Sequence, residues 1–204
     1  MSGEILSARW FAAMLDNMAA DKHQKHIHIL PEDDANRELA NGFSIGLNET
    51  VARRIQVLPV AGGWINVLDK FLSNHVKGMQ QFHNRFMILL IDFDRDVGRL
   101  EFATNRIPQS LRERVFILGS VDEPQQLIKA GCYKAEDLKR VGSKLEAIGY
   151  AMARACREET AEIWDHELLC NNAAELTRLK QFVRPILFQS IPGYAGAAIA
   201  PRTC

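Results

Sequence analysis

The sequence lacks the features of a membrane-spanning or secreted protein. No apolar run approaches the roughly 18 residues that a helix needs to cross a bilayer. Glu4 and Arg9 interrupt the apolar stretch at the start, which therefore does not resemble a signal peptide. The four cysteines form no CxxC pair and fit neither a zinc ribbon nor a disulfide framework. We expect a cytoplasmic protein with reduced thiols and no membrane partner.

The sequence also lacks net charge. Its 25 lysine and arginine residues balance 25 aspartate and glutamate residues, so no overall field draws the protein toward nucleic acid. Any contact with nucleic acid must therefore use a local basic patch. With 204 residues, 47% of them hydrophobic, the chain is long and apolar enough for one well-buried core.

Four short apolar segments are predicted to be strands. The stretch FMILLI is the most hydrophobic of the chain, and its charged borders are typical of a central parallel strand covered on both faces. The predicted strands are residues 27–30, 53–60, 86–91 and 114–120.

Helical patterns alternate with these strands. We predict helices over residues 4–19, 31–43 (after a turn), 64–76 and 108–114. Alternating strands and helices indicate βαβ units with right-handed crossovers. The expected fold class is therefore α/β, with a mainly parallel four-stranded sheet flanked by helices.

The pattern becomes helical in the second half of the chain. Pro185 is expected to end the last long helix, and the segment after it is rich in small residues. We expect an N-terminal helix over 1–24, an α/β core over 25–130, a helical part over 131–189 packed on the core, and a loose tail over 190–204.

Acidic residues follow three of the four predicted strands. Ligands of open parallel sheets bind outside the carboxyl ends of the strands, so these residues are expected to meet at one edge. The residues that follow the four strands in turn are Glu32; Gly62 and Gly63; Asp92, Asp94 and Asp96; and Asp122 and Glu123.

This acidic cluster is expected to bind Mg²⁺ or Mn²⁺. Two like charges about 4 Å apart cost roughly 4 kcal/mol at an effective dielectric of 20, so converging carboxylates recruit a cation. Oxygen ligands without thiolates suit a hard cation better than zinc. If the backbone stays extended, Asp92, Asp94 and Asp96 point to one side. Such an ion orients a phosphodiester and activates water, with Glu32 as a further ligand or general base.

Other polar residues are given lesser roles. Arg95 and Arg99 are expected to hold a phosphate, and Gly62 and Gly63 to leave room for it. Histidines and basic residues elsewhere are expected on solvated surface. Trp10, Trp64 and Trp164 are expected in the core or at an interface rather than as platforms on which bases stack. The residues assigned to solvated surface are His23, His26, His28, Arg178, Lys180 and Arg184.

The order of these motifs resembles the Toprim domain, the metal-dependent module of topoisomerases, primases and certain nucleases. In that family a glutamate follows the first strand and a DxD motif follows the third. Glu32 matches the glutamate, Asp92 and Asp94 match the DxD, and Asp96 completes a longer DxDxD. The resemblance covers roughly residues 26–130. The chain departs from it at Asp33, where the family usually has glycine.

The resemblance implies a Rossmann-like fold and a metal-dependent nuclease that acts on DNA or RNA. In the nuclease branch an acidic residue after the fourth strand also binds metal, and Glu123 is the candidate here. The compact chain is most similar to stand-alone Toprim nucleases associated with phage defence. Because it has no GxxxxGKS or GxxxxGKT motif, an ATPase partner would be a separate protein, and an oligomer is compatible with this hypothesis.

Two alternatives remain open at this point. A catalytically degenerate Toprim module would act as a scaffold subunit through its helical second half, which the neutral charge and the missing glycine favour. A phosphatase of the haloacid-dehalogenase type would use Asp92 as nucleophile and Asp94 as acid. That motif normally follows the first strand of the sheet, whereas Asp92 follows the third.

Overall fold

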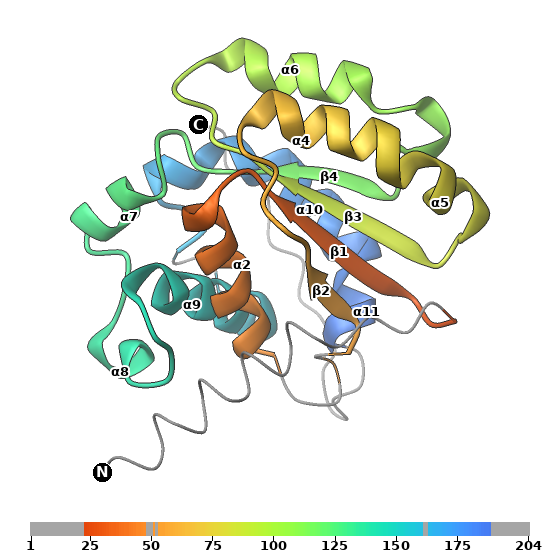
Figure 1. Cartoon of the computed structure of the whole chain (residues 1–204). Coiled ribbons are helices and arrows are strands. Elements are labelled where there is room, and N and C mark those ends of the chain that lie inside the picture. The colour runs from red at the N-terminus through yellow and green to blue at the C-terminus, as the bar shows by residue number, and fades with distance from the viewer. Residues whose placement is uncertain (1–22, 48–50, 52, 161–162, 189–204) are drawn as a thin grey trace.

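The computed structural model describes residues 23–47, 51, 53–160 and 163–188. A four-stranded parallel sheet forms its centre, in the order β2-β1-β3-β4 (Figure 1). The strands are β1 (His26–Pro31), β2 (Ile55–Val57), β3 (Arg85–Leu90) and β4 (Val115–Leu118). The predicted α/β fold class, which is Rossmann-like, is confirmed, and each strand lies within two to three residues of its predicted position or inside it.

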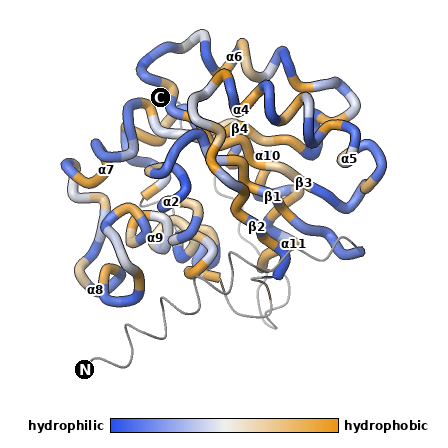
Figure 2. Tube along the Cα trace, in the orientation of Figure 1, coloured by the Kyte–Doolittle hydropathy of each residue, from blue (hydrophilic) through white to orange (hydrophobic). Residues whose placement is uncertain are grey.

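Helices cover both faces of the sheet because its strands are apolar on both faces. Along β3, Phe86 and Ile88 belong to one buried cluster, while Met87 and Leu89 belong to another on the opposite face. Figure 2 shows the strands as hydrophobic segments in the middle of the molecule. One face is covered by α4 (Trp64–Lys70), the π-helix η1 (Phe71–His75), α5 (Val76–Gln81) and α6 (Val97–Arg106). The other face is covered by α2 (Asp34–Ile45), α9 (Lys144–Glu158), α10 (Ala173–Phe182) and α11 (Arg184–Phe188).

The chain reverses its direction across the sheet between β1 and β3. It passes from β1 through α2 to β2 on one side, then crosses back so that β3 pairs with β1 and β4 follows beyond it. Right-handed crossovers in opposite directions place their helices on opposite faces, as observed for α2 and for α4 to α6. A reversal of this kind separates the loops after β1 and β3, and ligands of open α/β sheets bind at such a point.

Two glycines allow α2 and α9 to pack at very short range. A Cβ added at Gly149 would lie 2.0 Å from the carbonyl oxygen of Leu39, and one added at Gly42 would lie 2.0 Å from that of Glu146. The helix α9 begins with a capping box between Ser143 and Glu146. This close contact holds the helical second half against the start of the α/β core.

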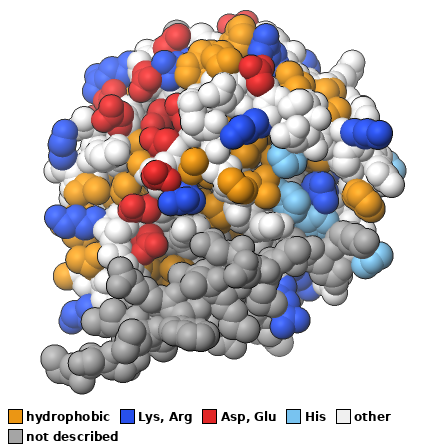
Figure 3. Space-filling model, in the orientation of Figure 1, with side chains coloured by type: hydrophobic (Ala, Val, Ile, Leu, Met, Phe, Trp, Pro, Cys, Tyr) orange, Lys and Arg blue, Asp and Glu red, His pale blue; other side chains and the backbone are white. Residues whose placement is uncertain are grey.

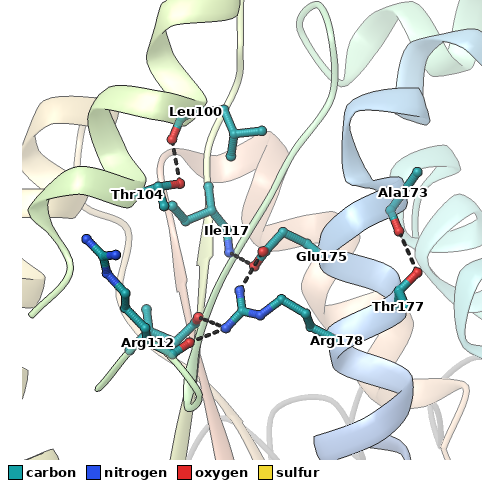
Figure 4. A network of polar contacts seen from close by, with 9 residues as sticks. Leu100, Thr104, Arg112, Ile117, Ala173, Glu175, Thr177 and Arg178 are labelled. Carbon is teal, nitrogen blue, oxygen red and sulfur yellow. Dashed lines mark hydrogen bonds and ion pairs between the residues drawn. The ribbon is translucent and has the colours of Figure 1, made fainter. Parts of the chain in front are cut away.

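Side chains from the 3₁₀ helix η3 (Glu167–Asn172) and from α10 cover the free edge of β4. Asn172 Oδ1 accepts a hydrogen bond of 2.9 Å from the N–H of Gly119, and its Nδ2 donates one of 2.7 Å to the Gly119 carbonyl. Glu175 Oε2 accepts one of 3.0 Å from the N–H of Ile117 (Figure 4). These side chains satisfy backbone groups that an open edge would present to another chain.

Two basic residues of the last helices are structural. Arg178 forms an ion pair of 2.5 Å with Glu175 and donates to the carbonyl of Arg112 (Figure 4). Arg184 forms an ion pair with Glu159. Both arginines are partly buried. The expectation of a solvated basic face is therefore wrong for Arg178 and Arg184.

The expected solvation of two histidines is also wrong. His26 and His28 are buried, with 1% and 8% of their surface exposed, while His23 is exposed. His26 and His28 alternate with isoleucines along β1, and this alternation is typical of a half-exposed strand. Here helices cover both faces of the sheet, so the polar face of β1 is buried as well.

The helix between β3 and β4 differs from the sequence prediction. The helix expected over 108–114 is reduced to the 3₁₀ helix η2 (Gln109–Leu111), and the connection is made by α6, which the sequence did not indicate. Asp96 begins α6 by accepting a hydrogen bond of 2.9 Å from the N–H of Gly98. Because α6 is largely polar and contributes few buried residues, its hydrophobic pattern is weak.

Short helices complete the part of the chain that the structure describes: α7 (Gln125–Lys129) and α8 (Ala135–Leu138). Within the same residues, no helix combines the length and apolarity needed to cross a membrane. Cys132, Cys156 and Cys170 are free thiols. The helix predicted over 4–19 and the tail predicted over 190–204 lie outside the described residues.

Candidate functional site

Glu32 and Asp92 meet where the chain reverses across the sheet. Glu32 directly follows β1, and Asp92 lies two residues beyond the end of β3. The backbone N–H of Asp92 donates a hydrogen bond of 2.9 Å to Glu32 Oε2. The two acidic residues that the sequence assigned to one edge therefore come together from adjacent parallel strands.

A polar cage that the sequence did not reveal surrounds the Asp92 carboxylate. Asn36, which is fully buried in the first turn of α2, donates a hydrogen bond of 3.0 Å from Nδ2 to Asp92 Oδ1. The hydroxyl of Ser120, just beyond β4, lies 3.3 Å from the same oxygen. Asp33 begins α2 and orients Asn36 by accepting hydrogen bonds from its backbone and side-chain amides. The second Asp92 oxygen, Oδ2, accepts no hydrogen bond from a described residue.

Burial shifts the protonation of both carboxyl groups. Burial is the largest cause that raises the pKa of Asp92 from 3.8 to about 7, and the charges of Glu32 and Asp33 raise it further. Burial also raises the pKa of Glu32, with added repulsion from Asp33 and Asp94. The hydrogen bond from Asp92 N–H and the charge of Arg99 oppose that shift. Two acidic groups whose pKa values are both raised by burial and by neighbouring charge are characteristic of functional sites.

Arg99 joins Asp94 to this pair. Its Nη1 donates a hydrogen bond of 2.8 Å to the carbonyl of Asp92 and forms an ion pair of 2.7 Å with Asp94 Oδ2. The Arg99 side chain is only 16% exposed, whereas that of Asp94 is 49% exposed. The predicted position of Arg99 beside the acidic residues is thus observed, with its guanidinium engaged by Asp94.

The acidic run after β3 does not remain extended. Asp94 and Arg95 have φ angles of 47° and 56°, which turn the chain sharply. As a result, Asp92, Asp94 and Asp96 do not form one row: Asp92 is buried, Asp94 pairs with Arg99, and Asp96 caps α6. The side-by-side arrangement expected from an extended backbone is not found.

Among the described residues, Asp122 and Glu123 form no hydrogen bond with Glu32 or Asp92, whereas Ser120 before them reaches Asp92. Arg95 binds Asp122 through Nε and Nη2, with a shortest distance of 2.6 Å, and this contact lowers the pKa of Asp122. Arg95 is therefore held by a carboxylate. The side chain of Glu123 is exposed.

The two glycines after β2 support the backbone of Glu32. The N–H of Gly62 donates a hydrogen bond of 2.7 Å to the Glu32 carbonyl, and that of Gly63 lies 3.4 Å from the same oxygen. Their φ angles of 86° and 129° are accessible to glycine at little cost. An added Cβ at either position would meet only the side-chain amide of Asn66, at 3.8 and 3.7 Å, so open space lies beside them.

The face of the molecule around the site carries both signs of charge. Figure 3 shows acidic side chains gathered on the left of the view, toward the end at which β1 and β3 finish, with lysine and arginine side chains among them. Asp122 and Asp94 are both neutralised by arginines. Glu32 and Asp92, like Asp33 and Asp96, have no direct ion pair among the described residues.

A magnesium ion fits this donor set better than a metal that needs a full protein cage. The described residues contain no group of three histidine, cysteine, aspartate or glutamate side chains arranged around one metal position. Mg²⁺ does not need one, because it is usually held by one or two carboxylates together with water and substrate phosphate. Glu32 and Asp92 supply two carboxylates at the same edge of the sheet. In addition, the buried Oδ1 of Asn36 has no partner among the described residues and is an oxygen donor of the type that Mg²⁺ accepts.

Comparison of the chain with protein families, curated proteins and solved structures finds no match.

Proposed function

We propose that the protein is a Mg²⁺-dependent or Mn²⁺-dependent phosphodiesterase that cuts nucleic acid at the Glu32–Asp92 pair. The observation that carries this proposal is the 2.9 Å hydrogen bond that joins the two residues at the reversal point of a parallel sheet. Two desolvated carboxylates at this position repel each other unless a proton or a cation lies between them. The order of the motifs along the chain, which resembles the Toprim domain, supports the same chemistry.

The residues of the site divide the work of hydrolysis. Glu32 and Asp92 would hold the cation, with Asn36 able to add an amide oxygen. When bound, the ion would neutralise phosphate charge and lower the pKa of a water molecule. Asn36 fixes the orientation of the Asp92 carboxylate through Oδ1. Ser120, whose hydroxyl makes its shorter contact with the Asp122 carbonyl, lies 3.3 Å from the same oxygen. Oδ2 is left for the cation or for a proton.

Arg99 has the role of positioning the acidic loop. Its guanidinium holds the Asp92 carbonyl and the Asp94 carboxylate at once, so it fixes the turn that follows β3. It also places a positive charge beside the pair, where a substrate phosphate would arrive. Asp94 can exchange this ion pair for the metal. Asp96, Arg95 and Glu123 have structural or surface positions and are not given catalytic roles.

The proposal places the protein in the cytoplasm, with nucleic acid as its substrate. Free thiols at Cys132, Cys156 and Cys170 agree with a reducing compartment. A defence role and a separate ATPase partner are consistent with a compact nuclease that has no phosphate-binding loop of its own. We therefore include the defence role and the separate ATPase partner in the proposal.

A cleavage assay with matched variants tests the proposal. The purified protein is incubated with plasmid, single-stranded DNA and single-stranded RNA in Mg²⁺, Mn²⁺ or EDTA. Glu32→Gln and Asp92→Asn should each lower the cutting rate by at least about a hundredfold, because each removes one anionic ligand. Glu136→Gln removes an exposed carboxylate of α8, a helix that contributes no residue to the site, and it should cut like the wild type. Cutting that survives in both site variants, or no cutting by the wild type, would contradict the proposal.

A phosphatase mechanism is the second candidate, favoured by the contact of Ser120 with Asp92. A nucleophilic Asp92 would form an acyl phosphate, and the Ser120 hydroxyl could bind a phosphate oxygen there. Rapid quenching with a labelled phosphomonoester distinguishes the two: phosphate trapped on Asp92 supports the phosphatase. A protein that binds no divalent cation and cuts neither substrate would instead be a scaffold subunit.

A further inference from the structure

Four side chains on α4 and α6 form a row in which two adjacent aromatic rings lie between two guanidinium groups. The Cζ atom of Arg99 lies 5.0 Å from the ring centroid of Trp64. The rings of Trp64 and Phe102 meet edge to face with centroids 5.5 Å apart. The Cζ atom of Arg106 lies 4.8 Å from the centroid of Phe102. We call these four residues the arginine–aromatic face.

The outer half of this face is open to solvent. Phe102 is 42% exposed, and the Arg106 side chain is 43% exposed. Among the described residues, Phe102 on α6 and Ile65 on α4 are the large hydrophobic side chains that are exposed. A scattered exposed hydrophobic residue needs no explanation, but an exposed ring held between an arginine and a second ring is a rigid, flat surface.

The inner end of the face reaches the candidate site. Arg99 contacts Trp64 and also holds the Asp92 carbonyl and the Asp94 carboxylate. Trp64 is the first residue of α4, directly after Gly63. The face therefore begins beside the acidic pair and extends outward along α6 to Arg106, the last residue of that helix.

We propose that the arginine–aromatic face binds the unpaired bases of a single-stranded nucleic acid whose backbone enters the Glu32–Asp92 site. This inference rests on the proposed function, because it names the substrate of the same site. A base can stack on Phe102, and base–aromatic stacking contributes about 1–3 kcal/mol per base. Arg106 faces the same ring and pairs with Asp69 at 3.4 Å, an exposed pair that a phosphate can displace at little cost.

The chemistry of the face favours a single strand over the other occupants. In a duplex the base faces are already stacked on one another, so Phe102 would have no partner. A protein partner would require a larger apolar surface than Phe102 and Ile65 provide. A ring that can stack on a base, with a guanidinium group close by that can meet a phosphate, suits a flexible single strand.

Binding without cleavage tests this inference separately from catalysis. Fluorescence anisotropy in EDTA compares a labelled oligothymidylate of about 12 nucleotides with an abasic oligomer of equal length and with a duplex. The wild type should prefer the thymidylate to both competitors by about tenfold or more. Phe102→Ala should abolish that preference, and Phe102→Trp should restore it. Tyr133→Ala is the matched control, since Tyr133 also carries a cation over its ring, Lys144 at 5.3 Å, but lies between α7 and α8.

The outcomes separate the two proposals. If Phe102→Ala binds thymidylate and abasic oligomer as the wild type does, the base-binding inference is overturned, whatever the cleavage assay shows. If the wild type prefers bases through Phe102 but never cuts, base binding stands and the phosphodiesterase falls. If sedimentation shows a dimer that Phe102→Ala dissociates and no preference for bases, the face is an interface between two copies, and the inference is overturned.

Discussion

The backbone N–H of Asp92 and the Oε2 atom of Glu32 lie 2.9 Å apart, although the two residues are separated by 60 positions in the chain. The contact crosses from β3 to β1 at the point where the strand order reverses. Because Glu32 accepts this hydrogen bond, its carboxylate stabilises the loop after β3, which carries the Asp92 carboxylate. Glu32 therefore has a structural role in this contact as well as its proposed role as a metal ligand.

Substitutions of Glu32 should separate the structural role of this residue from its charge. Glu32→Ala leaves the N–H of Asp92 without an acceptor and should lower the free energy of unfolding by roughly 1–3 kcal/mol. Glu32→Gln keeps an oxygen acceptor and removes a repelled charge, so it should be at least as stable as the wild type. Urea unfolding followed by circular dichroism measures both. Equal free energies of unfolding for the two variants would show that the hydrogen bond does not contribute to stability.

Asp92 should make stability depend on pH in the opposite sense from an ordinary carboxylate. Its pKa is about 7 in the folded protein and about 3.8 when unfolded, so the folded state holds a proton that the unfolded state releases. The free energy of unfolding should therefore fall as the pH rises from about 4 to about 7. Asp92→Asn should stabilise the protein by roughly 2–4 kcal/mol at pH 8 and much less at pH 4. Thermal unfolding at both pH values measures the difference. The same gain at both would refute the shift.

Much of the fold follows from the sequence because the strands are continuous apolar runs. FMILLI has no alternative to burial on both faces, and it becomes the central strand β3. The same rule, that ligands bind where parallel strands end, predicted that Glu32 and Asp92 would lie at one edge. Their direct contact is observed because β1 and β3 are neighbours in the sheet.

The details of the site could not be predicted because they depend on tertiary contacts. Asn36 and Ser120 carry no pattern that marks them, and they reach Asp92 only once α2 and β4 are packed beside β3. The positive φ angles occur at Asp94 and Arg95, whose side chains form ion pairs with residues outside this turn. One signal was available: an acidic residue just before a helix is a typical cap, and Asp96 is one.

His28 should make the protein sensitive to acid. Burial is the main cause that lowers its pKa to about 3, and Arg85, His26 and His75 lower it further. Between about pH 6.5 and pH 3, His28 binds a proton in the unfolded chain but not in the folded protein. The free energy of unfolding should therefore fall as the pH drops through this range. His28→Leu should reduce this loss, while His83→Leu at an exposed position should not. Unfolding free energies at pH 7 and pH 5 provide the comparison, and parallel losses in wild type and His28→Leu would contradict it.

The close contact of α2 with α9 should not tolerate a methyl group. The Cβ of Gly149→Ala would clash with the backbone of Leu39, and we expect a loss of about 1–3 kcal/mol or more. Gly78→Ala is the matched control in helix α5: its Cβ meets only the movable end of Arg85, at 3.0 Å, and the higher helix propensity of alanine offsets this. Thermal unfolding should rank Gly149→Ala well below Gly78→Ala. Equal melting temperatures would mean that the helices can separate.

Binding of Mn²⁺ to the purified protein tests the central claim most directly, because it needs no knowledge of the substrate. Titration followed by electron paramagnetic resonance or calorimetry should detect a site in the wild type whose affinity rises between pH 6 and pH 8, as Asp92 loses its proton. Glu32→Gln and Asp92→Asn should each weaken it by about tenfold or more, and Glu136→Gln should not. Equal affinity in all four proteins, or no binding at millimolar Mn²⁺, would contradict a metal site between Glu32 and Asp92.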